Sequence, residues 1–182
     1  MTANPRRTWL LGAATAAAAA GAAFGWWRFS ARTGHAQAAA SEAAPTGVWA
    51  QRFERPAGGE LVMAEMRGQP LLLNFWATWC APCIAEMPML DAFQRDQAAK
   101  GWQVVGLAVD NADPVREFVA KRPLGFAIGL VGFAGADLAR ELGNSAGALP
   151  FSVVFDRQGN IAHKKLGALK PEDLASWAKS VT

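Results

Sequence analysis

Two cysteines separated by two residues are the part of this sequence with the clearest chemistry. Cys80 and Cys83 are the two cysteines of the 182-residue chain. Thiols at this spacing can exchange a disulfide with each other and with a partner, or they can bind a metal. A framework of structural disulfides would need more cysteines in a short chain. The pair therefore indicates either redox chemistry or a metal site.

The residues around the pair predict that a helix begins at Cys80. The apolar run 71–76 is typical of a buried strand, and residues 82–100 follow with helical spacing. Unpaired N–H groups and the helix dipole stabilise a thiolate at a helix N-terminus. Pro82 has no N–H to compete for the sulfur. We expect Cys80 to be the exposed nucleophile and Cys83, one turn later, to be the more buried resolving thiol.

The remaining pattern predicts strands that alternate with helices. Such an order is typical of an α/β sandwich around a mixed sheet. We expect strands at 49–53, 61–63, 104–109 and 126–131, and a hairpin of 152–155 with 161–166. We expect helices at 113–121, 137–142 and 170–181. Asp113 should cap the first of these helices.

Two stretches resemble a known family. Residues 75–83, Phe-Trp-Ala-Thr-Trp-Cys-Ala-Pro-Cys, resemble the active-site motif of the thioredoxin superfamily. Glu86 and Pro88 complete a WCxPCxxExP pattern that resembles its TlpA/ResA branch, and residues 147–156 resemble the second signature of that branch. The resemblance covers residues 48–182. It implies a thioredoxin-like three-layer sandwich, with a central mixed sheet flanked by helices, an N-terminal β extension and a central insert.

The resemblance also assigns roles around the cysteines. Pro150 should have a cis peptide bond and lie against Cys80. The cis bond should turn the backbone of Leu149 outward, where it can pair with a strand of the substrate. Trp79 and the dipeptide Ala81-Pro82 should form the surroundings of the redox disulfide.

A departure from cytosolic thioredoxin directs attention to Glu86. Asn74 stands where that protein has an Asp thought to accept the proton of the resolving thiol, and an amide cannot do so. Glu86 lies one helical turn beyond Cys83. We expect it to handle the proton, with its pKa raised by partial burial. The alternative is a solvated glutamate on the helix surface.

Three other residues could join the chemistry. Met87 and Met89 lie close to the cysteines in the sequence, and two thioethers with two thiols could hold Cu(I). Methionines at this spacing also serve as core packing, which we expect here. We expect His163 to be a surface residue of a strand.

The charge distribution excludes nucleic-acid binding as the main function. Residues 1–40 hold four cations and no acid, which leaves 14 cations and 15 acids in residues 41–182. The basic balance of the chain therefore reflects its first 40 residues. Nucleic-acid binding needs cations clustered along one face.

The first residues indicate export. Residues 9–27 are uncharged, and a helix of this length, roughly 28 Å, matches a bilayer core. We expect a membrane anchor, with a cleaved signal peptide ending near 36–38, or a buried core helix, as alternatives. The expected organisation is a signal or anchor at 1–29, a flexible linker at 30–47 and a thioredoxin-like domain at 48–182.

These features together predict a membrane-tethered thiol–disulfide oxidoreductase on the periplasmic side of the inner membrane of a Gram-negative bacterium. The resemblance implies that its net activity is the reduction of protein disulfides. The resemblance implies exported clients, such as apocytochrome c or an oxidase subunit with a copper site. It also implies an electron donor of the DsbD/CcdA type in the membrane and no organic cofactor. The alternatives are a thiol oxidase or isomerase of the same fold, and a Cu(I) delivery module using Cys80 and Cys83.

Overall fold

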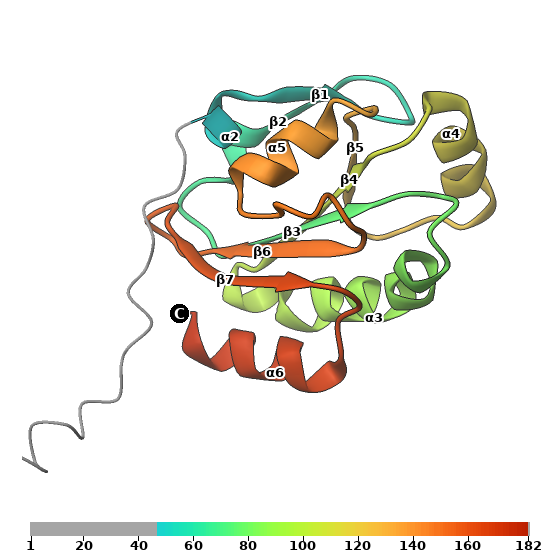
Figure 1. Cartoon of the computed structure of the whole chain (residues 1–182). Coiled ribbons are helices and arrows are strands. Elements are labelled where there is room, and N and C mark those ends of the chain that lie inside the picture. Colours follow the sequence, from blue (N-terminus) through green and yellow to red (C-terminus); the bar gives the residue numbers. More distant parts are fainter. Residues whose placement is uncertain (1–46, 182) are drawn as a thin grey trace, which may run out of the picture. The chain divides into compact units, whose positions relative to one another are not determined.

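A mixed β-sheet forms the centre of the computed structural model, which describes residues 47–181 (Figure 1). Within these residues the strand order is β2-β1-β5-β4-β3-β6-β7. The strands are β1 (Arg52–Glu54), β2 (Glu60–Val62), β3 (Leu71–Trp76), β4 (Gln103–Ala108), β5 (Ala127–Leu130), β6 (Phe151–Phe155) and β7 (Ile161–Leu166). The helices are α2 (Gly47–Ala50), α3 (Ala81–Gln97), α4 (Ala112–Lys121), α5 (Gly135–Glu141) and α6 (Pro171–Ser180), with 3₁₀ turns at Met63–Met66 and Ala98–Lys100.

The central strand β3 explains how the sheet divides the core. All six of its residues are buried, as its continuous apolar run predicts. It pairs in parallel with β4 and antiparallel with β6. Successive side chains of a strand point to opposite faces. Leu72 and Trp76 therefore enter one apolar cluster, whereas Leu73 and Phe75 enter the other.

Helices cover both faces of the sheet. Buried residues of α3, α4 and α6 pack in the cluster that contains Leu72 and Trp76. Buried residues of α2 and α5 pack in the cluster on the opposite face. Figure 1 shows α3 and α6 below the sheet and α5 above it. The three-layer α/β sandwich expected from the sequence is confirmed.

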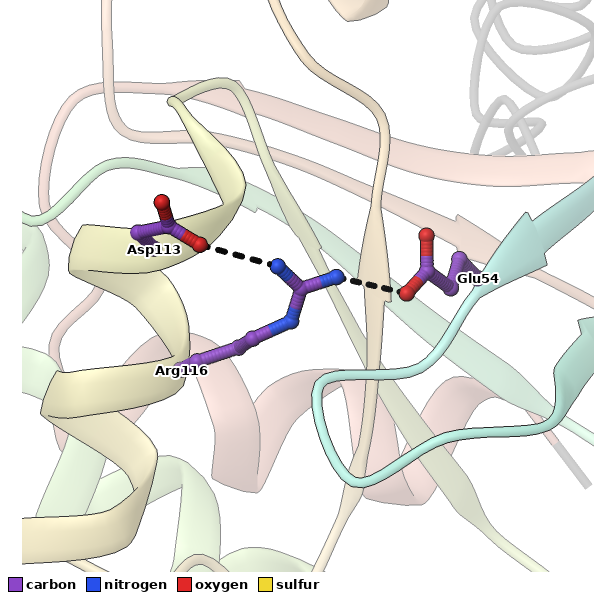
Figure 2. A network of polar contacts seen from close by, with 3 residues as sticks. All are labelled: Glu54, Asp113 and Arg116. Carbon is purple, nitrogen blue, oxygen red and sulfur yellow. Dashed lines mark hydrogen bonds and ion pairs between the residues drawn. The ribbon is translucent and has the colours of Figure 1, made fainter.

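The N-terminal hairpin extends the sheet and contacts the insert. β1 pairs with β2 and, on its other side, with β5. Arg116 of α4 reaches across to this hairpin, as Figure 2 shows. One of its guanidinium nitrogens lies 2.6 Å from Glu54 of β1 and the other 3.0 Å from Asp113 of its own helix. An ion pair therefore joins the β extension to the segment inserted between β4 and β5.

Two local predictions are wrong. The strand expected at 49–53 is a helical turn followed by the three-residue strand β1. Val48 and Trp49 are both buried, and two neighbouring residues of a strand cannot face the same side. The helix expected to be capped by Asp113 begins at Ala112. The carboxylate of Asp113 accepts a hydrogen bond from Arg116 instead of capping the helix.

The predicted anchor and most of the linker, residues 1–46, lie outside the described residues. Among residues 47–181, no helix is both long and apolar enough to span a bilayer.

Candidate active site

Cys80 and Cys83 form a disulfide at the first turn of α3. The S–S distance is 1.99 Å and the two Cα atoms lie 5.2 Å apart. Cys80 is the N-cap residue of the helix, where its Sγ accepts a hydrogen bond of 3.4 Å from the N–H of Cys83. Pro82 stands in the first turn, as predicted. A sulfur in this position faces the N–H groups that stabilise a thiolate.

The two cysteine residues differ in their exposure to solvent, but both are buried. Cys80 is 5% exposed and Cys83 is fully buried. The expectation of an exposed Cys80 is therefore wrong for the disulfide form, although Cys83 is the more buried of the two. The covered position follows from packing, since both residues belong to the apolar cluster on the α3 face of the sheet. Their neighbours Trp79, Ala81 and Pro82 are exposed.

The loop before β6 carries a cis peptide bond between Leu149 and Pro150. Pro150 is buried, and its carbonyl accepts a hydrogen bond of 2.8 Å from the N–H of Gly167. Leu149 packs against the cluster that contains both cysteines. Within residues 47–181 its main-chain N–H and C=O form no hydrogen bond. The loop therefore presents free backbone groups at Leu149, which lines a pocket together with Trp79.

Glu86 of α3 lies inside the molecule, where it contacts the central strand β3 through Asn74. Asn74 faces the same side of the sheet as Leu72 and Trp76, which is the side that α3 covers. Its Nδ2 donates a hydrogen bond of 2.8 Å to Glu86 Oε1 and one of 3.0 Å to the hydroxyl of Ser152, its partner on β6. The N–H of Leu169 donates to Glu86 Oε2 at 2.8 Å. The surface alternative is wrong, since Glu86 is 4% exposed.

The environment of Glu86 shifts its titration. Burial raises the pKa of Glu86 above its ordinary value because a carboxylate is costly to desolvate. The hydrogen bonds from Leu169 and Asn74, and the charge of Lys165, act in the opposite direction and are outweighed. The result is a buried carboxyl group, one helical turn from Cys83, that takes up a proton more readily than a solvated glutamate.

Asp110 is a residue of this site that the sequence reasoning missed. Its Oδ2 accepts hydrogen bonds from both the N–H and the hydroxyl of Thr78, two residues before Cys80, and its Oδ1 accepts one from the N–H of Asn111. The carboxylate is buried. A signal existed, because parallel neighbours β3 and β4 end at the same edge of the sheet and Asp110 follows β4 closely. Asp110 fixes the segment that leads into the disulfide.

The remaining candidates are packing residues. Met87 is buried in the cluster on the α3 face, and Met89 packs against it. His163 stacks on Trp177 and shares a 2.9 Å hydrogen bond with Ser180. Burial lowers the pKa of His163. In the described part of the chain, no group of three or more His, Cys, Asp or Glu side chains is arranged to hold a metal ion.

The family model for Redoxin matches residues 39–180, and the chain belongs to this family. Its fold and cysteine pair define a thiol–disulfide oxidoreductase. Relatives include the thiol-disulfide oxidoreductase ResA of Bacillus thuringiensis (strain Al Hakam), 29% identical over 126 residues, which are 69% of this chain and 70% of that protein. The ResA of Geobacillus kaustophilus is 29% identical over 129 residues, which cover 68% and 70% of the two chains.

Solved structures of proteins named for thiol–disulfide exchange are similar in fold to this chain. A thiol:disulfide interchange protein DsbE from Chlorobium tepidum superposes with a TM-score of 0.64 at 25% identity, covering 78% of this chain and 94% of that one. A secreted thiol-disulfide isomerase from Corynebacterium glutamicum superposes with a TM-score of 0.63 at 26% identity, covering 72% and 83%. The chain is an enzyme of the ResA/TlpA-like branch of the thioredoxin superfamily.

Proposed function

We propose that this protein reduces disulfides of exported proteins, with Cys80 as the attacking and Cys83 as the resolving cysteine. The observation that carries the proposal is the Cys80–Cys83 disulfide at the start of α3. The cis peptide before Pro150 supports it, because Leu149 of that peptide lines one pocket together with Trp79, the residue before Cys80. The thiol–disulfide oxidoreductase names of the relatives support the class of reaction. We propose the direction of electron flow, the roles of the two cysteines and the clients.

The exchange takes place in two displacements that balance. In the reduced enzyme, the Cys80 thiolate attacks one sulfur of the client disulfide. The second client sulfur leaves as a thiolate and takes up a proton. Cys83 then attacks Cys80 Sγ, which restores the enzyme disulfide and releases the first client sulfur as a thiolate that is protonated. Two electrons pass to the client, and the enzyme ends in the disulfide form that the structure describes.

Glu86 is our candidate for the proton acceptor of Cys83. A thiol must lose its proton before it attacks. The buried carboxylate of Glu86 lies one helical turn further along α3, and its raised pKa brings it closer to that of a thiol. The proton can then return to the departing client thiolate. Asn74, Ser152 and Leu169 act as positioning residues, because their hydrogen bonds hold this carboxyl group and its neighbours in place.

The client polypeptide is held, in this proposal, by the loop before Pro150. The free main-chain groups of Leu149 can form hydrogen bonds with an extended client segment, in the manner of an added strand. Trp79, Ala81 and Pro82 lie next to the cysteines in the chain and are exposed to such a client. The mixed disulfide is thereby held while Cys83 attacks.

We further propose that residues 1–29 anchor the protein, residues 30–47 act as a linker and the domain at 48–182 faces the periplasm. The uncharged stretch at 9–27 supports the anchor. Clients would be apocytochrome c or a copper-site subunit of an oxidase, and electrons would come from a membrane thiol-transfer protein of the DsbD/CcdA type. The disulfide carries the electrons itself, so no organic cofactor is needed.

The reduction potential of the Cys80–Cys83 pair tests the direction. The chain contains no other cysteine, so alkylation and mass spectrometry in a thiol redox buffer report this pair alone. We expect a value near or below about −220 mV, which suits a reductant. A value near about −120 mV would make the protein an oxidant and overturn the proposal. Absence of a reversible two-electron transition would favour the Cu(I) alternative.

A further inference from the structure

A small apolar pocket lies directly beside the candidate active site. Its volume is about 260 Å³, and its lining includes Trp79, Val109, Phe133, Ala136, Gly147 and Leu149. Small-molecule sites usually have volumes of about 300–1,000 Å³. The pocket is therefore better matched to one side chain than to an organic ligand.

The pocket shares its lining with the site of disulfide exchange. Trp79 directly precedes Cys80, and Leu149 directly precedes Pro150 of the cis peptide. A client whose sulfur is bonded to Cys80 must therefore pass over residues that line the pocket. The reaction itself brings a polypeptide to this surface, which identifies the occupant as part of that polypeptide.

The residues that line the pocket also determine which kind of side chain can bind there. No charged residue lines the pocket. Trp79 and Phe133, which are 65% and 63% exposed, are two of the three exposed large apolar side chains among residues 47–181. Exposed aromatic side chains that meet at a pocket are a feature of interaction sites. An uncharged, apolar side chain fits this environment, and a charged one would lose its hydration without a partner.

One wall of the pocket is held in place by a hydrogen bond. Asn144 lines the pocket and is buried, and its Nδ2 donates to the carbonyl of Ala148 at 2.9 Å. This bond ties the segment after α5 to the residue before Leu149. The pocket and the loop that would bind the client backbone are therefore one connected surface.

We propose that this pocket binds one apolar, preferably aromatic, side chain of the client polypeptide, within a few residues of the client cysteine. The enzyme thus selects disulfides by their neighbouring residues. The inference rests on the proposed reductase function and deepens it, since it names the class of client segment. Full burial of such a side chain corresponds to about a ten- to hundredfold gain in kcat/KM for the matching client.

The test compares pairs of synthetic peptide disulfides reduced by the full chain. Within each pair, one peptide has Phe and the other Ser at one position, placed one to four residues before or after the cysteine. We expect at least one placement at which the Phe peptide has a kcat/KM about tenfold higher or more. Phe133→Ser, which removes one wall, and Ala136→Leu, which fills the pocket from α5, should each bring this ratio close to one.

Leu166→Ser is the matched control. Leu166 is the third exposed large apolar residue and does not line the pocket, so its variant should keep the preference for Phe. Equal rates for Phe and Ser at every placement in the unmodified protein would overturn the pocket inference and leave the reductase function standing. Failure to reduce any peptide would instead contradict the proposed function. A preference that survives both pocket variants would place the recognition elsewhere and overturn the inference.

Discussion

The buried carboxyl group of Glu86 has a thermodynamic consequence that can be measured without a substrate. Its pKa in the folded protein is raised above the ordinary value of 4.5, so the folded state binds the proton more tightly than the unfolded state. The stabilising contribution is complete below pH 4.5 and is lost as pH rises through the raised pKa. Within that window, the slope can reach about −1.4 kcal/mol per pH unit.

Glu86→Gln should remove this component. We expect the free energy of unfolding, measured with urea from pH 4 to 8, to fall less steeply with pH in the variant. Glu117→Gln is the control of opposite sign. The Lys121 ammonium lowers the pKa of Glu117 on the surface of α4, so its small contribution appears as pH rises. A wild-type slope retained in Glu86→Gln would show that Glu86 does not titrate in this range.

The same variant also tests the proposed proton transfer. If Glu86 accepts the proton of Cys83, its loss should slow the second displacement and leave the first unaffected. The mixed disulfide between Cys80 and the client should therefore accumulate, and acid-quenched mass spectrometry would detect it. A reaction with an unchanged pH profile and no trapped intermediate would contradict the role of Glu86.

The residues of the candidate active site differ in how well their roles could be predicted from the sequence. Cys80, Cys83 and Pro150 belong to local motifs whose spacing is itself informative, and the disulfide and the cis peptide lie at the expected positions. Asp110 and Phe133 have no such motif. Asp110 matters because the end of β4 lies beside the end of β3, and Phe133 because the turn before α5 lies at the pocket. Both depend on contacts between distant segments, which no local pattern contains.

At the scale of elements, the ends of β3 and β4 act together through Asp110. Asp110→Ala would remove the acceptor of both hydrogen bonds from Thr78 and leave its N–H without a protein partner. We expect a loss of about 1–3 kcal/mol in the free energy of unfolding. We also expect slower attack by Cys80 on a peptide disulfide, because the loop before it is less well fixed. Urea unfolding and stopped-flow kinetics would measure the two effects.

Asp113→Ala provides the comparison for this prediction. Asp113 lies three residues further along the chain, and its side chain is 94% exposed in the ion pair with Arg116 (Figure 2). Exposed ion pairs contribute about 0–1 kcal/mol. Equal stability and equal rates in the two variants would mean that Asp110 does not fix the active-site loop.

The elements that the sequence predicted well are those with long, unambiguous patterns. The continuous apolar run of β3 and the helical spacing of α3 each identify one element, and both are present. The start of the domain was harder to predict. Gly47–Ala50 is a single turn whose shape follows from burying Val48 and Trp49 together. That requirement comes from the core around them and not from their own sequence.

For the described molecule as a whole, the elements that begin the domain, from α2 to the turn after β2, are part of the core. Trp49 of α2 lies against Phe155 of β6, with ring centroids 4.9 Å apart, and Arg67 lies over its ring. Leu61 and Met63 are fully buried in the same cluster. The β extension thus contributes to the folding of the domain, in addition to widening its sheet.

Trp49→Ala should therefore destabilise the whole domain. We expect a loss of about 3–5 kcal/mol in the free energy of unfolding, as is typical when a large buried aromatic residue is truncated. Trp79→Ala is the same change at an exposed position, and its effect on stability should be within about 0.5 kcal/mol. Chemical denaturation of both variants would measure the difference. Similar values would show that α2 is not integrated into the core.

The two outer strands of the sheet affect how readily other polypeptide segments can add to it. β2 has three residues, of which Glu60 forms an ion pair with Arg52, and β7 carries Lys164 and Lys165. Short edge strands and charged side chains resist the addition of further strands. If its clients are unfolded polypeptides, as the proposed function implies, the enzyme would meet segments able to extend its sheet into an aggregate. We expect these edges to discourage such growth, so that contact with a client ends in disulfide exchange and not in a shared sheet.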